Sequence, residues 1–494
     1  MLGLTTPGQR AEDLRRWAKR LALKGGATVS HIMLRRRPGR RDLSPAPKGT
    51  GLKPIPGDRG LPIVGHALAA ATLPIEFLER QLEHYGAVSW MRGFATPFVL
   101  ALGPEAAQEV LANNDHVFSQ KGQEFFSGRF FGRGLMFLDF EEHHSHRRIM
   151  QEAFTRERLN GYLHPMDTIC HAAAAELAED ELLVYPYLKR TLLDIATVAF
   201  MGEEPGPQSR LMNKAFNDCL HAATAVIRFP VPGLRWSAGV RSRRALEQYF
   251  HTNIEVRRTS GGDNLFAALC RVRDNDGHQF ADDDIVDHMI FLMSAATDTS
   301  AAAATATLHQ LARHPEWQNR VRAESADIGD GGLDLDALDR MQSLDMVINE
   351  SMRLFPPVPV VCRKTLADTS IQGHFVPADT MVAVAPLINH YWPGLWSAPH
   401  TFDPDRFSDA RREDKSHRLA FMPFGAGAHK CIGMHFATIV VKVLLHHLLR
   451  DHRIEMRSGY TLEWDMTALP APIDDFPVLI RRANDSYPNV TVAT

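Results

Sequence analysis

The sequence predicts one large, mainly helical domain with a small β region. The chain has 494 residues and is 45% hydrophobic, which is enough for a large buried core. Residues 61–482 contain no repeat period and no internal linker that would divide them into separate units. Helical patterns dominate this stretch, and only short runs have the character of strands.

The first fifty residues are expected to form a basic extension. Residues 1–50 carry a net charge of +9, so the remainder of the chain carries about −12. Arg10 to Lys24 predicts an amphipathic helix whose apolar face holds Leu14, Trp17, Ala18 and Leu21. It is followed by a basic cluster of Arg35, Arg36, Arg37, Arg40 and Arg41 and a Pro/Gly-rich linker. Such a segment suits either peripheral contact with an anionic membrane or a solvated tail.

Within the rest of the chain, the pattern places short strands between long helices. The strands are predicted at Ala87–Trp90, Phe98–Leu102, Thr369–Ile371 and Met381–Val384. A long helical run covers Asp284–Leu311. We therefore divide the chain into a basic extension with its linker (1–55), one large folded domain (56–483) and a polar tail (484–494).

Charge, cysteine usage and hydropathy exclude several classes of protein. A net charge of −3 gives no reason to expect nucleic-acid binding. The cysteines are odd in number and widely spaced, which indicates a reducing compartment and no disulfide framework; they are Cys170, Cys219, Cys270, Cys362 and Cys431. No uninterrupted apolar run reaches the length of a membrane span, and the N-terminus lacks a secretory signal. We expect a cytoplasmic protein.

The strongest local signal is the segment Phe424–Gly433, which reads FGAGAHKCIG. Glycines on both sides of Cys431 let the backbone pass close beneath a flat macrocycle, and Phe424 can shield the sulfur from water. The apolar residues after Cys431 follow helical spacing. A thiolate here would therefore sit at a helix N-terminus, where the helix dipole favours negative charge.

This segment resembles the haem-binding loop of cytochromes P450, F-x-x-G-x-x-x-C-x-G, at Phe424, Gly427, Cys431 and Gly433. The resemblance covers residues 55–482 and looks closest to actinobacterial, particularly mycobacterial, members of the family. It implies the cytochrome P450 fold, haem b as cofactor and Cys431 as the axial ligand of the iron. A buried, unreactive cysteine is the ordinary alternative for Cys431.

A second segment, Ala295–Ser300, resembles the family's oxygen-side helix motif, with Ala296 where glycine is more usual. Leu292, Ala295, Ala296 and Thr299 recur at helical spacing, so they are expected to share one face. The resemblance implies that small residues leave room for dioxygen, that Thr299 donates a hydrogen bond to it, and that Asp298 relays protons.

Two further sets of residues resemble family motifs. Glu350 and Arg353 lie three apart on a predicted helix, and Arg406 is expected to complete a Glu-Arg-Arg network. The two haem propionates need cationic or hydrogen-bonding partners, and the resemblance assigns that role to His143, Arg147, Arg363 and His429. An ordinary surface charge is the alternative for each of these four residues.

The resemblance implies a monooxygenase that uses O2 and draws electrons from a separate ferredoxin and ferredoxin reductase, or an equivalent donor, since the chain has no flavin or iron–sulfur motif. An aromatic, Pro-rich stretch at Ile227–Pro232 is expected to form a lid. The expected pocket favours a bulky lipophilic substrate such as a terpenoid, steroid or lipid. Its predicted lining is Phe125, Phe126, Leu292, Ala295, Ala296, Val358, Val360 and Leu469.

Two other functions remain open from sequence. One is a haem-thiolate protein that does not oxygenate with O2, such as a peroxide-dependent hydroxylase, an isomerase or a sensor. The presence of Asp298 and Thr299 argues against it. The other is a haem-free helical binding protein whose basic extension is the working part, and a colourless purified protein would favour it.

Overall fold

The computed structural model describes residues 7–36, 39–223, 225, 228–229, 231–259, 262–273, 277–329, 332–467 and 469–482, with side chains of the first helix from Ala18 onward. Several sequence predictions fall outside these described residues. They are the polar tail 484–494, the side chains of Leu14 and Trp17, the basic residue Arg37, and Ile227 and Pro230 of the expected lid.

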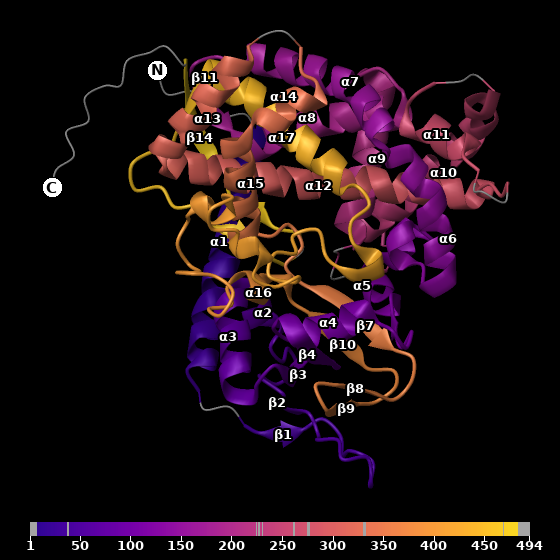
Figure 1. Ribbon diagram of the computed structural model, residues 1–494, viewed down its shortest axis with the longest axis vertical. Helices are drawn as coiled ribbons and strands as arrows, with labels where there is room; N and C mark the ends of the chain where they lie inside the picture. Colours follow the sequence, from indigo (N-terminus) through magenta and orange to yellow (C-terminus); the bar gives the residue numbers. More distant parts are fainter. Residues whose placement is uncertain are drawn as a thin grey trace.

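Helices make up most of the described chain and occupy the larger, upper part of the molecule in Figure 1. In chain order they are α1 (Pro7–Leu34), α2 (Ala67–Thr72), α3 (Pro74–Tyr85), α4 (Pro104–Ala112), α5 (Lys121–Phe131), α6 (Phe140–Gln151), α7 (Arg156–Ala175), α8 (Val184–Ala196), α9 (Pro207–Ala223), α10 (Arg235–Thr259), α11 (Leu265–Arg271), α12 (Asp282–Arg313), α13 (Pro315–Ile328), α14 (Leu335–Arg340), α15 (Gln342–Leu354), α16 (Pro386–His390) and α17 (Met434–Asp451).

The strands form one large sheet, at the lower end of Figure 1, and three small ones. The large sheet has the order β1-β2-β3-β4-β10-β7-β5, the second has β11-β14-β6, and two hairpins pair β12 with β13 and β8 with β9. Their bounds are β1 (Arg41–Asp42), β2 (Pro56–Asp58), β3 (Val88–Gly93), β4 (Thr96–Ala101), β5 (Phe118–Ser119), β6 (Glu181–Leu183), β7 (Val361–Thr365), β8 (Thr369–Ile371), β9 (His374–Val376), β10 (Met381–Val384), β11 (His452–Glu455), β12 (Trp464–Asp465), β13 (Ala471–Pro472) and β14 (Pro477–Arg482).

Helix α12 crosses the centre of the helical part and organises its core (Figure 1). Three aspartates in its first turn, Asp282, Asp283 and Asp284, complement the positive end of the helix dipole. It ends at Arg313, before the break at Pro315. From Ile285 to Leu311 most of its side chains are buried, so it is a helix of the protein interior.

The predicted fold class is confirmed, and most predicted elements lie where the pattern placed them. The predicted strands at 369–371 and 381–384 are β8 and β10, and those at 87–90 and 98–102 overlap β3 and β4. The long helical run is α12, extended by two residues at each end. Strands this short were detectable because Gly and Pro residues bound them.

The N-terminal extension differs from its prediction. Helix α1 continues ten residues beyond Lys24, to Leu34, and packs on α2 and α3. The contact side is formed by Gly26, Ser30 and Met33, whereas Leu21, on the predicted apolar face, is half exposed. The expected linker also joins the large sheet, because β1 pairs with β2. The pattern therefore predicted a helix here, but not its last ten residues or their packing on α2 and α3.

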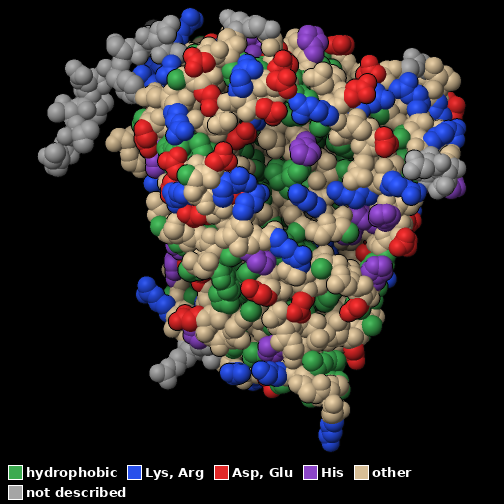
Figure 2. All heavy atoms as spheres, in the orientation of Figure 1, with side chains coloured by type: hydrophobic (Ala, Val, Ile, Leu, Met, Phe, Trp, Pro, Cys, Tyr) green, Lys and Arg blue, Asp and Glu red, His purple; other side chains and the backbone are tan. Residues whose placement is uncertain are grey.

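One stretch of the described chain, Gly427–Asp451, has the length and composition of a membrane span. It consists largely of α17, and most of it is buried inside the protein. Its apolar character is explained by its position, since α17 packs against α7, α12 and α13. Figure 2 shows charged side chains of both signs spread over the face in view.

Candidate functional site

The segment before α17 folds as a tight loop that ends on Cys431. The Cys431 N–H donates to the Phe424 carbonyl at 2.9 Å and closes the loop. Gly427 has a φ of 70°, and a Cβ at this position would collide with the carbonyl oxygen of Leu111 at the end of α4. Only glycine fits such a left-handed position against a neighbouring backbone. Gly433 follows as the residue that caps α17.

Cys431 differs from the other four cysteines, which all lie in the described chain and are buried, because its side chain is exposed. The protein around the open sulfur still desolvates it and raises the thiol pKa. A hydrogen bond from the Gly433 backbone and the charges of Arg147 and Lys430 act in the opposite direction and favour the thiolate. An accessible sulfur beside donors and cations is suited to bind a metal ion.

Four cationic or potentially cationic side chains gather beside this loop from three separate segments. The rings of His143 (α6) and His429 lie 3.8 Å apart between centroids, and Arg147 and Arg363 (β7) are close enough to repel them. Burial and these positive charges lower the pKa of His143 to about 4 and that of His429 to about 2. Burial also lowers the pKa of Arg363 to about 10.

This cluster lacks the anions that would balance it. Within the described chain, none of the four side chains has a carboxylate within ion-pairing distance, and His429 Nδ1 is buried without a hydrogen-bond partner. Arg363 is buried and Arg147 is half-buried, and cations in such positions are expected to be paired. A ligand that carries two carboxylates beside a macrocycle would supply the missing partners, so these residues fit haem and its propionates.

The oxygen-side motif lies on the one partly open stripe of central α12. Phe291, Ala295, Ala296 and Thr299 are half-buried, while their neighbours on the helix are buried. Thr299 Oγ1 donates to the Ala295 carbonyl at 2.7 Å. Its hydrogen is therefore directed along the helix, and the hydroxyl presents acceptor lone pairs unless its side chain rotates.

The partly open stripe of α12 includes Phe291 at its N-terminal end, whereas Leu292, which was predicted to line the pocket, is buried. Leu292 is only 6% exposed and belongs to the hydrophobic core, whereas Phe291 lies on the open stripe. Phe291 makes edge contacts with Phe131 and Phe137, at centroid distances of 6.4 and 5.9 Å. A spacing of i, i+4, i+8 from Phe291 through Ala295 to Thr299 was the available signal.

Asp298 is turned away from the open stripe and is paired. Its carboxylate lies 2.6 Å from Lys189 Nζ on α8, and Lys189 also donates to Asn217 on α9 at 3.2 Å. The pair is largely buried, with side-chain exposures of 9% for Asp298 and 18% for Lys189. Sequence analysis missed Lys189, because no local pattern links a residue of α8 to one of α12.

Glu350, Arg353 and Arg406 meet in a fully buried network. Arg353 donates to both carboxylate oxygens of Glu350, at 2.7 and 2.8 Å, and Arg406 donates to the same carboxylate at 3.1 Å. Glu413, which the sequence did not indicate, is 2.7 Å from Arg406. Burial raises the pKa of Glu413, but hydrogen bonds from Ser397, Arg411 and Arg406 outweigh it and lower that pKa to about 2.

His390 connects this network to the cysteine loop. Its Nδ1 lies 3.1 Å from the Arg353 carbonyl, and its Nε2 accepts from the Met422 N–H at 3.0 Å, two residues before Phe424. The neutral imidazole satisfies both contacts, in agreement with a pKa that burial lowers to about 3. The network therefore fixes the backbone that leads into the loop.

The remaining predicted pocket residues lie in different environments. Phe126 stacks on Phe98, while Phe125 is 55% exposed and lies beneath the guanidinium of Arg228. Val358 and Leu469 are half-buried, and Val360 is 37% exposed. The structure therefore places Phe125 at the surface rather than on an interior wall.

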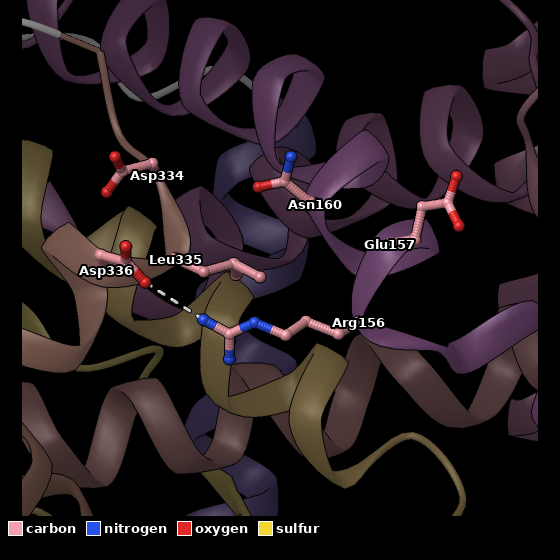
Figure 3. A pocket seen from close by; sticks show the side chains of 6 residues that line it. All are labelled: Arg156, Glu157, Asn160, Asp334, Leu335 and Asp336. Carbon is pink, nitrogen blue, oxygen red and sulfur yellow. Dashed lines mark hydrogen bonds and ion pairs between the residues drawn. The ribbon is translucent and has the colours of Figure 1, made fainter.

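A shallow charged hollow lies elsewhere, between the start of α7 and α14 (Figure 3). Its Arg156 side chain pairs with Asp336 at 3.2 Å, and both are mostly exposed. It contains none of the predicted site residues, and its lining is Arg156, Glu157, Asn160, Asp334, Leu335 and Asp336. Its open, polar character does not suit a lipophilic ligand.

Comparison with known proteins shows the family to which the chain is similar. The family model described as Cytochrome P450 matches residues 55–468. A protein of Mycobacterium tuberculosis described as cytochrome P450 136 is 46% identical over 92% of this chain and 94% of its own length. Pentalenene oxygenase of Streptomyces avermitilis is 30% identical over 80% of this chain and 90% of its own. The solved structure of retinoic acid-bound cyanobacterial CYP120A1 superimposes with a TM-score of 0.78 at 26% identity, covering 87% of this chain and all of the other.

Proposed function

Because the chain belongs to the cytochrome P450 family, whose members are haem monooxygenases that use O2 and a separate electron donor, we propose that it oxygenates a lipophilic terpenoid, steroid or lipid with electrons from a ferredoxin and its reductase. The observation that carries the proposal is the exposed Cys431 beside Arg147 and Arg363, which have no anionic partner within the described chain, and two imidazoles that can hydrogen-bond. Residues 56–483 form the proposed catalytic domain.

The roles of the site residues follow from their positions. Cys431 would ligate the haem iron, with the backbone turns at Gly427 and Gly433 and the ring of Phe424 shaping its loop. His143, Arg147, Arg363 and His429 would hold the propionates. When bound, haem supplies the activation of O2 that inserts oxygen into a C–H bond. The chain itself binds and orients the substrate, excludes water and supplies protons.

The terpenoid or lipid preference rests on the apolar stripe of α12. Phe291, Ala295 and Ala296 present an aromatic ring and two methyl groups on the partly open face of an otherwise buried helix. Two relatives are named for the oxygenation of pentalenene and of cyclooctat-9-en-7-ol, and these names point in the same direction. We infer that Phe126, Val358, Val360 and Leu469 complete the walls, with Phe125 at the rim.

Lys430 is exposed beside Cys431 and is the proposed contact for an acidic electron donor. We propose a cytoplasmic location for the enzyme. A membrane contact through the extension would have to use basic residues other than Lys19, Arg20 and Lys24, because these three pair with carboxylates of the protein itself.

The test of the proposed function is reconstituted turnover. The purified holoenzyme, NADPH, a ferredoxin and its reductase are expected to convert members of a panel of sesquiterpenes, sterols and long-chain fatty acids. Each product should gain one oxygen atom from isotopically labelled O2. Product that forms with hydrogen peroxide but not with the redox chain would contradict the proposed electron source, and rearrangement without oxygen gain would contradict the monooxygenase reaction.

Asp298 and Lys189 give a separate prediction. Asp298→Asn should lower kcat by about 10²- to 10⁴-fold and raise the solvent kinetic isotope effect, since it removes the group proposed to deliver protons. Lys189→Met keeps the carboxylate and should lower kcat far less. The comparison is made on both variants at equal haem content. Equal losses in the two variants, with unchanged isotope effects, would show that the pair only holds α8 against α12.

A further inference from the structure

Helix α1 carries three cations that all pair with one hairpin near the C-terminus. Lys19 lies 2.7 Å from Asp465, Arg20 lies 2.8 Å from Glu463 and 3.2 Å from Asp474, and Lys24 lies 3.2 Å from Glu463. Glu463 precedes β12, Asp465 is its last residue and Asp474 follows β13, so the contacts lie along β12 and at the open end of the hairpin. Figure 1 shows α1 (indigo) along one edge of the molecule, between its helical and strand-rich parts.

The ion pairs form a network rather than isolated contacts. Arg20 bridges two carboxylates, and Glu463 is shared by two cations. Burial raises the pKa values of Glu463 and Asp465, but hydrogen bonds from Arg20, Lys24 and Lys19 help to lower both overall. Single exposed pairs contribute little, and networks with shared partners contribute more.

The other end of α1 is anchored independently of these charges. Gly26 packs closely on the side chain of Leu68, and the hydroxyls of Ser30 and Thr72 are 2.9 Å apart. Arg80 donates at 3.0 Å to the carbonyl of Leu34, the last residue of α1. Removing the charges at residues 19–24 should therefore release the hairpin without detaching the C-terminal half of α1.

The paired hairpin packs on the segment that leads to the cationic cluster. Trp464 lies between Glu463 and Asp465, and its ring stacks on Phe355 at 5.6 Å and 26°. Phe355 begins the stretch 355–363, which carries Val358 and ends at Arg363. Leu469 lies in the turn of the same hairpin. A shift of the hairpin would thus move both a proposed pocket wall and the backbone before Arg363.

We propose that α1 acts as an electrostatic strap. Lys19, Arg20 and Lys24 are positioning residues that hold the hairpin 462–473 against the segment 355–363. In this way they set the shape of the substrate pocket. The inference rests on the proposed function, because Val358 and Leu469 are pocket residues only there. The basic extension would then have a role within the protein itself, because α1 would increase the affinity of the site for bulky ligands.

The test uses the full-length holoenzyme with Lys19→Gln, Arg20→Gln and Lys24→Gln combined. The control is Arg35→Gln, which removes an exposed cation for which the described chain shows no ion pair. Two ligands of the haem iron are titrated into each protein, and their affinities are measured from the shift of the haem absorption band. Clotrimazole is bulky and reaches the pocket walls, whereas imidazole is small and reports only on the iron and its immediate surroundings.

The triple variant is expected to bind clotrimazole about tenfold more weakly and imidazole with unchanged affinity, and amide exchange over 462–473 should accelerate by a similar factor. In the wild type, raising the ionic strength from about 0.01 M to about 1 M should also weaken clotrimazole binding and accelerate amide exchange in the hairpin. The reason is that the screening length falls from about 30 Å to about 3 Å. The control should match the wild type.

The outcomes separate the two proposals. Unchanged clotrimazole affinity and unchanged hairpin exchange, with normal imidazole binding, would overturn the strap and leave the proposed function intact. Equal weakening of both ligands would also overturn it, because it would indicate general damage to the haem site. Failure of the wild type to bind imidazole at all would instead contradict the haem-thiolate function.

Discussion

Replacement of Cys431 by serine is expected to abolish the strongly red-shifted Soret band of the reduced, carbon monoxide-bound protein. Among the five cysteines, Cys431 alone is exposed; burial raises the pKa of its thiol, while Gly433, Arg147 and Lys430 act against this rise. A serine hydroxyl keeps the size of the side chain but ionises far less readily and cannot supply the electron-rich sulfur ligand. Monooxygenase activity should fall by more than the roughly 10- to 100-fold typical of residues that only support a ligand.

The matched control is Cys170→Ala, which removes a buried thiol from α7, with the spectrum expected to remain that of the wild type. The measurement is a difference spectrum of dithionite-reduced protein, taken at equal protein concentration with haem content determined separately. A red-shifted band that survives in Cys431→Ser would refute thiolate ligation by this residue. Wild-type protein that never binds haem would refute the proposed cofactor site as a whole.

Replacement of Glu350 by glutamine should destabilise the protein more than any surface substitution. Glu350, Arg353 and Arg406 are completely buried, and Glu350 is the carboxylate that both arginines share. Glutamine retains the shape but removes the charge, so two buried guanidinium groups lose their common counter-ion. Breaking a buried pair in this way costs about 3–5 kcal/mol of unfolding free energy. The measurement is urea unfolding of the holoenzyme, followed by circular dichroism and by Soret absorbance.

Haem loss should precede the main unfolding transition in Glu350→Gln, because Arg353 is linked through His390 to Met422 and the cysteine loop. Glu413→Gln serves as the comparison, since Glu413 is partly exposed and contacts only Arg406 of the three network residues. It should shift the transition less. Equal, small shifts in both variants would show that the buried network does not stabilise this fold.

Much of the site could be predicted from sequence because its chemistry demands particular residues at short spacing. The cysteine loop requires glycine at Gly427 and a backbone donor next to Cys431, and both requirements leave a local signature. The pair Glu350 and Arg353 is visible because the two residues lie one helical turn apart. Fixed short-range geometry of this kind is readable without a structure.

The sequence could not decide which face of a helix its neighbours cover. The sequence pattern placed Leu292 on the oxygen-side face, whereas the structure buries Leu292 and leaves Phe291 partly open. In α1 the predicted apolar face ends at Leu21, whereas Gly26, Ser30 and Met33, which lie beyond the predicted helix, make the contact with the protein. Apolar residues on both sides of a helix carry no information about which side a neighbour covers.

The sequence by itself determined the fold class, the long central helix, the cysteine loop and the family, because these depend on local pattern and on residues close together in the chain. Only the tertiary structure decided the pairings between distant segments. It joined Lys189 to Asp298, Glu413 to Arg406, and the basic face of α1 to the hairpin around Trp464. An ion pair requires proximity but no fixed spacing in the chain, so its partner is set by packing alone.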